Sequence, residues 1–174
     1  MKNSKRKLGM KWLLTGAFLF AGILIHNAPC QTRVRNEIRI PDIPGYKTLK
    51  CDFHIHTVYS DGNVQPHIRP EEAWREGFDA IAITDHVEDE NMDGQHNRSY
   101  ELARSRAKSL GIILIRGGEI TRSMPPGHFN AIFIEDVTPL DTKNYKNAIK
   151  AAIKQGAFVF WNHPGWTGQQ PDGI

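Results

Sequence analysis

The chain has 174 residues, of which 40% are hydrophobic and 24% are charged, and this balance is typical of a globular domain. With only two cysteines, the composition excludes a scaffold held together by several disulfides. Five of the 22 basic residues precede residue 12, so residues 31–174 carry 17 basic and 19 acidic side chains, and the formal charge of +3 is no sign of nucleic-acid binding.

Residues 1–30 are predicted to form a signal peptide. The basic first eleven residues are followed by an apolar run of fourteen, residues 12–25. This run is short for a membrane span of about 20 residues and fits the core of a signal peptide. Small residues before Gln31 offer a cleavage site, so we expect export to the periplasm or secretion. Lipid attachment at Cys30 and an uncleaved membrane anchor are the alternatives.

Residues 31–46, which are rich in proline and polar side chains, are predicted to be a linker. After removal of the leader we expect no contact with the membrane. Cys51 is then the one remaining thiol, and we expect it to be buried by packing rather than catalytic.

The first predicted strand of the domain carries His54 and His56. Side chains of a strand alternate between its faces, so these imidazoles point one way while Phe53 and Ile55 point the other. Two histidines at this spacing can bind one divalent cation, and Asp61 supplies an anionic ligand just after the strand.

Four further hydrophobic runs are predicted to be strands, each with candidate ligands at one end. Asp85 and His86, Glu119, and His163 each follow such a run, whereas His128 opens one. Five of the eight histidines therefore lie at strand termini, which predicts a shared site. The predicted strands cover residues 80–86, 112–119, 127–134 and 157–163.

Amphipathic helices are predicted between these strands, at residues 70–77, 99–111 and 141–156. Pro70 is typical of the first turn of a helix, Ser99 is a candidate N-cap, and each segment ends in glycine. Apolar strands alternating with helices predict an α/β fold with a parallel sheet, either a barrel or a doubly wound sheet. We favour the barrel, because its strand ends meet over one mouth, whereas the outer strands of an open sheet lie too far apart to share ligands.

The ordered motifs resemble the signature of the PHP family, which is named for bacterial polymerases and histidinol phosphatases. The resemblance runs from about residue 49 to 165 and implies a distorted (β/α)7 TIM-like barrel. It also implies two to three divalent metals, Zn, Mn or Fe, and hydrolysis of phosphate esters. The motifs are His54-x-His56, Ser60-Asp61-Gly62, Thr84-Asp85-His86, Gly118-Glu119, His128-x-Asn130 and Asn162-His163-Pro164.

The resemblance also implies which residues hold each metal. The first would be bound by His54, His56 and Glu119, the second by Glu119, His128 and His163, and the third by Asp61 and His86. Family members end with an Asp-x-His motif that does not occur after His163 here. We therefore expect residues 47–174 to be an incomplete PHP-type hydrolase domain, with about five of seven strand and helix units.

The expected activity is hydrolysis of a small-molecule phosphate ester by a hydroxide that bridges the metals. Glu119 would bridge two ions because a carboxylate has two oxygens. Asp85 would orient a ligand or relay a proton, or would merely cap the following turn. Arg122, and less so Arg116, would grip the phosphate. The alternatives are a metallo-hydrolase that cuts C–N or other bonds, and a non-catalytic PHP module.

Overall fold

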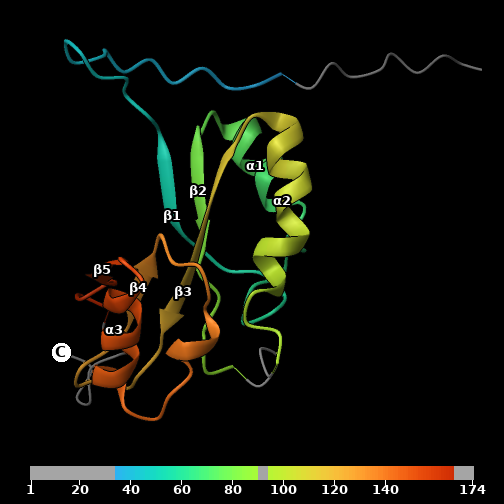
Figure 1. Cartoon of the computed structure of the whole chain (residues 1–174). Helices are drawn as coiled ribbons and strands as arrows, with labels where there is room; N and C mark the ends of the chain where they lie inside the picture. Colours follow the sequence, from blue (N-terminus) through green and yellow to red (C-terminus); the bar gives the residue numbers. More distant parts are fainter. Residues whose placement is uncertain (1–33, 90–93, 167–174) are drawn as a thin grey trace, which may run out of the picture. The chain divides into compact units, whose positions relative to one another are not determined.

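The computed structural model describes residues 34–89 and 94–166, so the predicted signal peptide lies outside the described residues. Strands and helices alternate along the chain in the order that the sequence predicts (Figure 1). The strands are β1 (Cys51–Ile55), β2 (Ala80–Ile83), β3 (Ile113–Ile120), β4 (Phe129–Ile132) and β5 (Phe158–Trp161). The helices are α1 (Arg69–Glu76), α2 (Arg98–Leu110), α3 (Tyr145–Lys154) and the short 3-10 helix η2 (Thr138–Leu140).

The five strands form one sheet in the order β1-β2-β3-β4-β5. β1, β2 and β3 run parallel, but β4 is antiparallel to both β3 and β5. The prediction of an all-parallel sheet is therefore wrong for β4. The connection from β3 to β4 has only residues 121–128, whereas a parallel crossover needs about a dozen residues or more.

The reversed direction of β4 explains why His128 precedes a strand, whereas the other candidate ligands lie near or after the end of one. An antiparallel strand begins at the edge where its neighbours end. His128 therefore lies beside the carboxyl ends of β3 and β5, together with Glu119 and His163. The result is an α/β fold with a curled, open sheet, whose edge strands in the described residues are β1 and β5.

Helices and strands bury apolar side chains on both faces of the sheet. On one face, Ala73 of α1 and Ala107 of α2 pack against Ile81. On the other face, Ala80 and Ala82 pack against residues of β3 and β4. All of β2 is buried, as expected for a near-continuous apolar strand covered on both faces. Helix α3 packs over β4 and β5, where Ala148 and Ala152 are buried in a third cluster.

A register irregularity in β1 alters which residues share a face. The pairing with β2 shifts between Asp52 and Ile55. Phe53 packs in the cluster of Ala80, whereas Ile55 packs in the cluster of Ile81 on the opposite face. The prediction that Phe53 and Ile55 point the same way is therefore wrong, because a bulge breaks the strict alternation of side chains.

Two further expectations about single residues are wrong. Cys51 is exposed at the start of the edge strand β1 and is not buried. Ser99 is not the N-cap of α2, which is Asn97; it lies in the first helical turn and its side chain bonds Asp85 instead. The exposure of Cys51 and the hydrogen bond of Ser99 both depend on contacts with distant residues rather than on local sequence.

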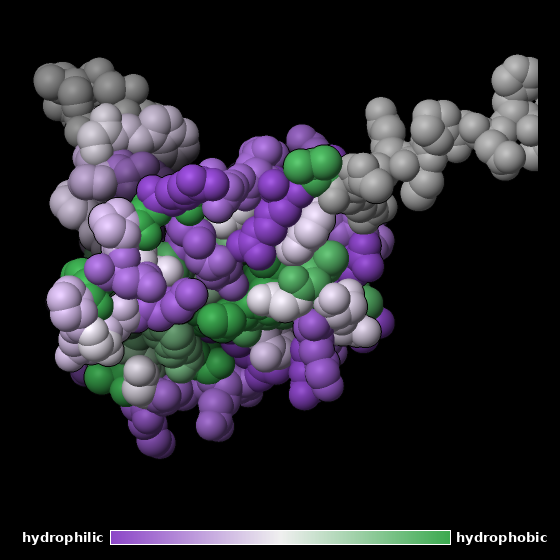
Figure 2. All heavy atoms as spheres, turned by 90° about the horizontal axis from the view of Figure 1, so that it is seen from above, coloured by the Kyte–Doolittle hydropathy of each residue, from purple (hydrophilic) through white to green (hydrophobic). Residues whose placement is uncertain are grey.

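The end of the strands opposite the candidate ligands carries exposed apolar side chains. Ile113 and Phe158 begin β3 and β5, Leu49 lies two residues before β1, and all three are exposed. Figure 2, which views the molecule of Figure 1 from above, shows apolar atoms gathered between polar ones on that face. Among the helices of the described ranges, none is both long enough and apolar enough to cross a membrane.

The segment predicted as a linker contacts the domain where α1 ends. Residues 34–46 form no regular helix or strand, but the backbone N–H of Asn36 donates to the carbonyl oxygen of Arg75 at 2.8 Å. Arg35 donates to the Asp79 carboxylate at 2.8 Å. Gly77, the C-cap of α1, has a φ of +88°, and a Cβ added there would lie 2.5 Å from the Asn36 carbonyl oxygen.

Replacing Gly77 with alanine is expected to destabilise the domain by about 2 to 3 kcal/mol, through a strained left-handed φ and a clash with Asn36. Gly111 is the matched control: it caps α2 at a φ of +70°, and a Cβ there would meet nothing within 4 Å. Gly111→Ala should therefore cost only about 1 kcal/mol. Denaturant unfolding measures both, and equal costs would mean that residues 34–36 are not held against α1.

Candidate metal centre

One edge of the sheet gathers five histidines and two carboxylates from all five strands and their adjoining loops. The carboxyl ends of β1, β2, β3 and β5 and the start of β4 supply these side chains. They line a cavity of about 330 Å³. The lining residues are His54, His56, Asp61, His86, Glu119, His128, His163 and Trp166.

Glu119 lies at the centre of this cluster and is completely buried, with an exposure of 0%. Its Oε1 is 3.4 Å from Nε2 of His54, 3.2 Å from Nδ1 of His128 and 3.4 Å from Nε2 of His163. One carboxylate oxygen therefore faces ring nitrogens from β1, from the start of β4 and from the end of β5.

The other oxygen of Glu119 faces the two remaining histidines. Oε2 is 3.2 Å from Nε2 of His56 and 3.1 Å from Nδ1 of His86. No described residue donates a hydrogen bond to this buried oxygen. Asp61 closes the group, with its carboxylate 3.0 Å from Nδ1 of His56 and 3.4 Å from Nε2 of His86.

These distances fit divalent cations. Nε2 of His54 and Nε2 of His56 face each other at 3.0 Å. In a tetrahedral zinc site with Zn–N bonds of about 2.0 to 2.1 Å, neighbouring ligand atoms are separated by about 3.3 Å. Divalent cations bind ligand sets of this kind, in which an anionic oxygen that accepts no hydrogen bond is surrounded by imidazole nitrogens at that spacing.

Three overlapping groups of side chains each bring their ligand atoms within 4.8 Å of one another. The first group, His54, His56 and Glu119, is the set implied for the first metal. Asp61 and His86, implied for the third metal, lie together with His56. Glu119 and His128, implied for the second, lie together with His86, while His163 reaches Glu119 from β5. The groups are His54–His56–Glu119, His56–Asp61–His86 and His86–Glu119–His128.

Electrostatics keep Glu119 ionised. Burial by itself raises the pKa of this carboxyl, because a buried charge loses its hydration. Contacts from His54, His56 and Asn162 act the other way and are stronger together, so the pKa of Glu119 lies well below its usual range. The Glu119 carboxylate is therefore ionised at neutral pH.

A chain of buried amides holds Glu119 in place from across the sheet. Nδ2 of Asn162 donates to Oε1 of Glu119 at 2.6 Å and to Oδ1 of Asn130 at 2.8 Å. Nδ2 of Asn130 in turn donates to the carbonyl oxygen of Phe53 at 2.9 Å. No role was predicted for either asparagine, although each lies within two residues of a candidate ligand at a strand end. That position is the signal that could have found them.

Asp85 is buried, with an exposure of 2%, and makes no hydrogen bond to a histidine of the described residues. Its carboxylate accepts from the backbone N–H of Thr57 at 2.5 Å, the Thr57 hydroxyl at 2.8 Å, the Ser60 hydroxyl at 2.9 Å and the Ser99 hydroxyl at 2.5 Å. The Ser60 hydroxyl lies 3.3 Å from Nδ1 of His56. Asp85 thus ties the loop after β1, which carries Asp61, to the first turn of α2.

The two arginines that flank Glu119 in sequence do not line the cavity. The guanidinium of Arg122 is committed to the Glu88 carboxylate and to the carbonyl oxygens of Thr121 and Thr142. That of Arg116 lies over the ring of Tyr100, 4.3 Å from its centre. The geometry therefore does not support the prediction that Arg122 grips a phosphate, because its donors already have partners within the protein.

The chain matches a protein family and several solved structures. A family model described as the PHP domain matches residues 52–160. A solved two-domain protein from Bacteroides vulgatus, described as containing a predicted PHP-like metal-dependent phosphoesterase, is 58% identical with a TM-score of 0.75. That match covers 80% of this chain and 42% of the other, so the chain spans less than half of that protein's length.

Two further solved structures are more distant. A protein from Bifidobacterium adolescentis, assigned by inference as a metal-dependent phosphoesterase, is 27% identical with a TM-score of 0.39, covering 49% of this chain and 27% of its own. An amidohydrolase from Chromobacterium violaceum is 20% identical with a TM-score of 0.44, covering 60% and 32%. Neither likeness is strong enough to support an argument about this chain. No curated protein matches it.

Proposed function

The chain belongs to the PHP domain family, and from this premise we propose that it is a metal-dependent phosphoesterase that hydrolyses small phosphate esters. One observation carries the proposal: the buried Glu119 carboxylate, which faces five imidazole nitrogens at 3.1 to 3.4 Å beside an open cavity. A donor set of this kind fits a cluster of two to three divalent cations, which we propose to be Zn, Mn or Fe.

The assignment of ligands that we propose follows the contacts. His54 and His56 would hold one ion with Glu119, and His128 and His163 would share Glu119 with a second. Asp61 and His86 would hold the third. Bound cations of this kind neutralise phosphoryl charge and lower the pKa of a coordinated water.

The protein's own groups set the geometry of this site. Asn162 fixes the orientation of the Glu119 carboxylate, so that both of its oxygens face the histidines. Asp85 fixes the loop that brings Asp61 to His56. Since neither Arg116 nor Arg122 lines the cavity, recognition of the phosphate falls to the histidine and carboxylate cluster and the ions it binds.

We further propose that in the whole protein the curled sheet is part of a distorted (β/α)7 barrel, of which residues 47–174 supply about five units. The exposed apolar side chains on the edge strand β5, Phe158 and Trp161, support this proposal. A crystal structure of the full-length gene product tests it, and a sheet that ends at β5 in that structure would disprove it.

Hydrolysis by the full-length gene product is the direct test of the proposed function. The protein should hydrolyse an aryl phosphate; a chelator should abolish the activity and added metal should restore it. Alkylation of Cys51 should leave the rate unchanged, because its thiol lies outside the cavity. Cleavage of aryl amides without cleavage of phosphates would support the C–N hydrolase instead, and metal binding without hydrolysis would support a non-catalytic module.

We also propose that the protein is exported, on the basis of the basic and apolar pattern of residues 1–30. Expressed with its leader in a bacterium, it should be recovered from the periplasm with an N-terminus at or near Gln31. N-terminal sequencing and mass spectrometry measure this. An N-terminus at Met1 or a diacylated Cys30 would contradict cleavage by the ordinary signal peptidase.

A further inference from the structure

Among the described residues that line the cavity, Trp166 alone offers no atom that binds a metal. Its ring centre lies 5.4 Å from that of His163 at an interplanar angle of 88°, and 6.2 Å from that of His128 at 73°. The indole therefore stands nearly perpendicular to two candidate ligands. Trp166 is 53% exposed, so about half of its surface remains free beside the cluster.

The turn that follows β5 determines the position of Trp166. The backbone N–H of Trp166 donates to the carbonyl oxygen of His163 at 2.9 Å, which closes a turn with Pro164 and Gly165 at its centre. Asn162, just before the turn, donates its own backbone N–H to the carbonyl oxygen of His128 at 2.9 Å. The ring is therefore placed by the same short segment that delivers His163 to Glu119.

The cavity has a polar part, lined by histidines and carboxylates, and a second part beside the Trp166 indole. Its seven other lining residues are histidines and carboxylates, and the described lining contains no lysine or arginine. Under the proposed function, a phosphate would therefore be held by the cations that the histidine and carboxylate cluster binds. The volume of about 330 Å³ equals that of about ten water molecules, which exceeds the need of the five heavy atoms of a phosphate group. The indole borders the space that remains.

From this arrangement we infer that Trp166 forms a leaving-group subsite that selects phosphate esters carrying a flat ring, such as an aryl or a heteroaromatic group. The inference rests on the proposed phosphoesterase function. A flat ring gains offset or edge-to-face contact with the indole in addition to burial, whereas a saturated group of equal size gains burial alone. The competing explanation is that Trp166 only supports the rings of His128 and His163.

Two non-hydrolysable ligands separate these explanations. Phenylphosphonate and cyclohexylphosphonate share one head group and nearly one size, but only the first has a flat ring. Calorimetry on the metal-loaded, full-length gene product should give phenylphosphonate an affinity about three- to tenfold higher. In Trp166→Leu this ratio should fall to within about twofold of unity, in Trp166→Phe most of it should remain, and metal content should be unchanged in both.

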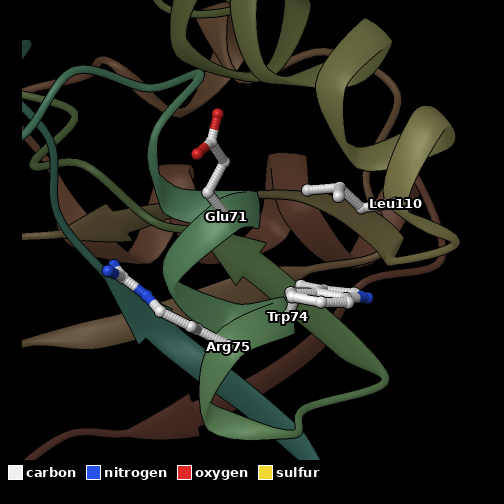
Figure 3. A pocket seen from close by; sticks show the side chains of 4 residues that line it. All are labelled: Glu71, Trp74, Arg75 and Leu110. Carbon is white, nitrogen blue, oxygen red and sulfur yellow. The ribbon is translucent and has the colours of Figure 1, made fainter. Parts of the chain in front are cut away.

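Trp74 supplies the matched control. It lies on α1 and lines a separate hollow of about 110 Å³ with Glu71, Arg75 and Leu110, between α1 and α2 (Figure 3). Trp74→Phe should therefore leave the affinity ratio of the two phosphonates unchanged. Quenching of tryptophan fluorescence by phenylphosphonate should persist in Trp74→Phe and be lost in Trp166→Leu.

The outcomes distinguish a failure of this inference from a failure of the proposed function. If both phosphonates bind but the ratio is the same in the wild type and in Trp166→Leu, the subsite is disproved while the function stands. If Trp166→Leu loses metal and weakens both ligands equally, Trp166 is a support for His128 and His163, and the subsite is again disproved. If the metal-loaded wild type binds neither phosphonate, the phosphoesterase function itself is wrong.

Discussion

Replacing Glu119 with glutamine is expected to remove at least one equivalent of divalent metal and to lower metal affinity by more than about 100-fold. The substitution keeps the shape of the side chain and removes its charge. It also places an NH2 group among ring nitrogens that now lie 3.1 to 3.4 Å from carboxylate oxygens. Hydrolysis should be abolished, because every proposed ion except the one held by Asp61 and His86 shares this carboxylate.

Glu88 is the matched control for this substitution. It is also a partly buried glutamate, but it pairs with Arg122 and does not line the cavity. Glu88→Gln should therefore retain the full metal content. Elemental analysis of both variants, with circular dichroism to confirm folding, gives the answer. Full retention of metal in a folded Glu119→Gln would mean that Glu119 is not a ligand, and equal losses in both variants would mean that the effect is not specific to the cluster.

The candidate ligands could be predicted from sequence because each is a local feature. His86, Glu119 and His163 each follow an apolar run, and strands that run in one direction bring such ends to one edge of the sheet. His54 was found by its spacing from His56. The direction of β4 could also have been predicted, because the eight residues that join it to β3 leave no room for a crossover helix. The apolar runs alone do not show this direction, because a parallel and an antiparallel strand can have the same run.

Other features depend on contacts between distant parts of the chain, which no local pattern records. The bulge in β1 that separates Phe53 from Ile55 depends on how that strand pairs with β2. Arg122 lies three residues after Glu119 in the sequence, which suggested a phosphate clamp. Its guanidinium is instead held by Glu88, 34 residues away. The role of Asn162 in orienting Glu119 is likewise visible only from its hydrogen bond to that carboxylate, 43 residues away.

Asp85 joins distant parts of the chain through hydrogen bonds beside the candidate metal site. Replacing it with alanine is expected to lower the unfolding free energy by about 3 to 5 kcal/mol. The buried carboxylate accepts four hydrogen bonds from Thr57, Ser60 and Ser99. Alanine would leave these donors in a buried space without an acceptor, and each such orphan costs about 1 to 3 kcal/mol before water or rearrangement offsets part of it.

The same substitution should also weaken metal binding at Asp61 and His86. Asp85 holds Thr57 and Ser60, and Ser60 directly precedes Asp61, so release of this loop moves Asp61 away from its position 3.0 Å from Nδ1 of His56. The metal that depends on Asp61 should then bind about 10- to 100-fold more weakly. The ions at Glu119 should be affected less, since Asn162 orients that carboxylate independently of the loop.

Ser99→Ala is the control that separates the loss of the whole Asp85 carboxylate from the loss of one of its hydrogen bonds. It removes a single donor and leaves Asp85 with its three bonds to Thr57 and Ser60, so it should cost only about 1 kcal/mol and retain all metals. Denaturant unfolding of metal-free protein measures the loss of unfolding free energy. Metal titration of the folded protein measures the loss of metal affinity. If Asp85→Ala were no more costly than Ser99→Ala, the carboxylate would not organise the loop. Asp61 would then owe its position to the metal it binds rather than to the fold.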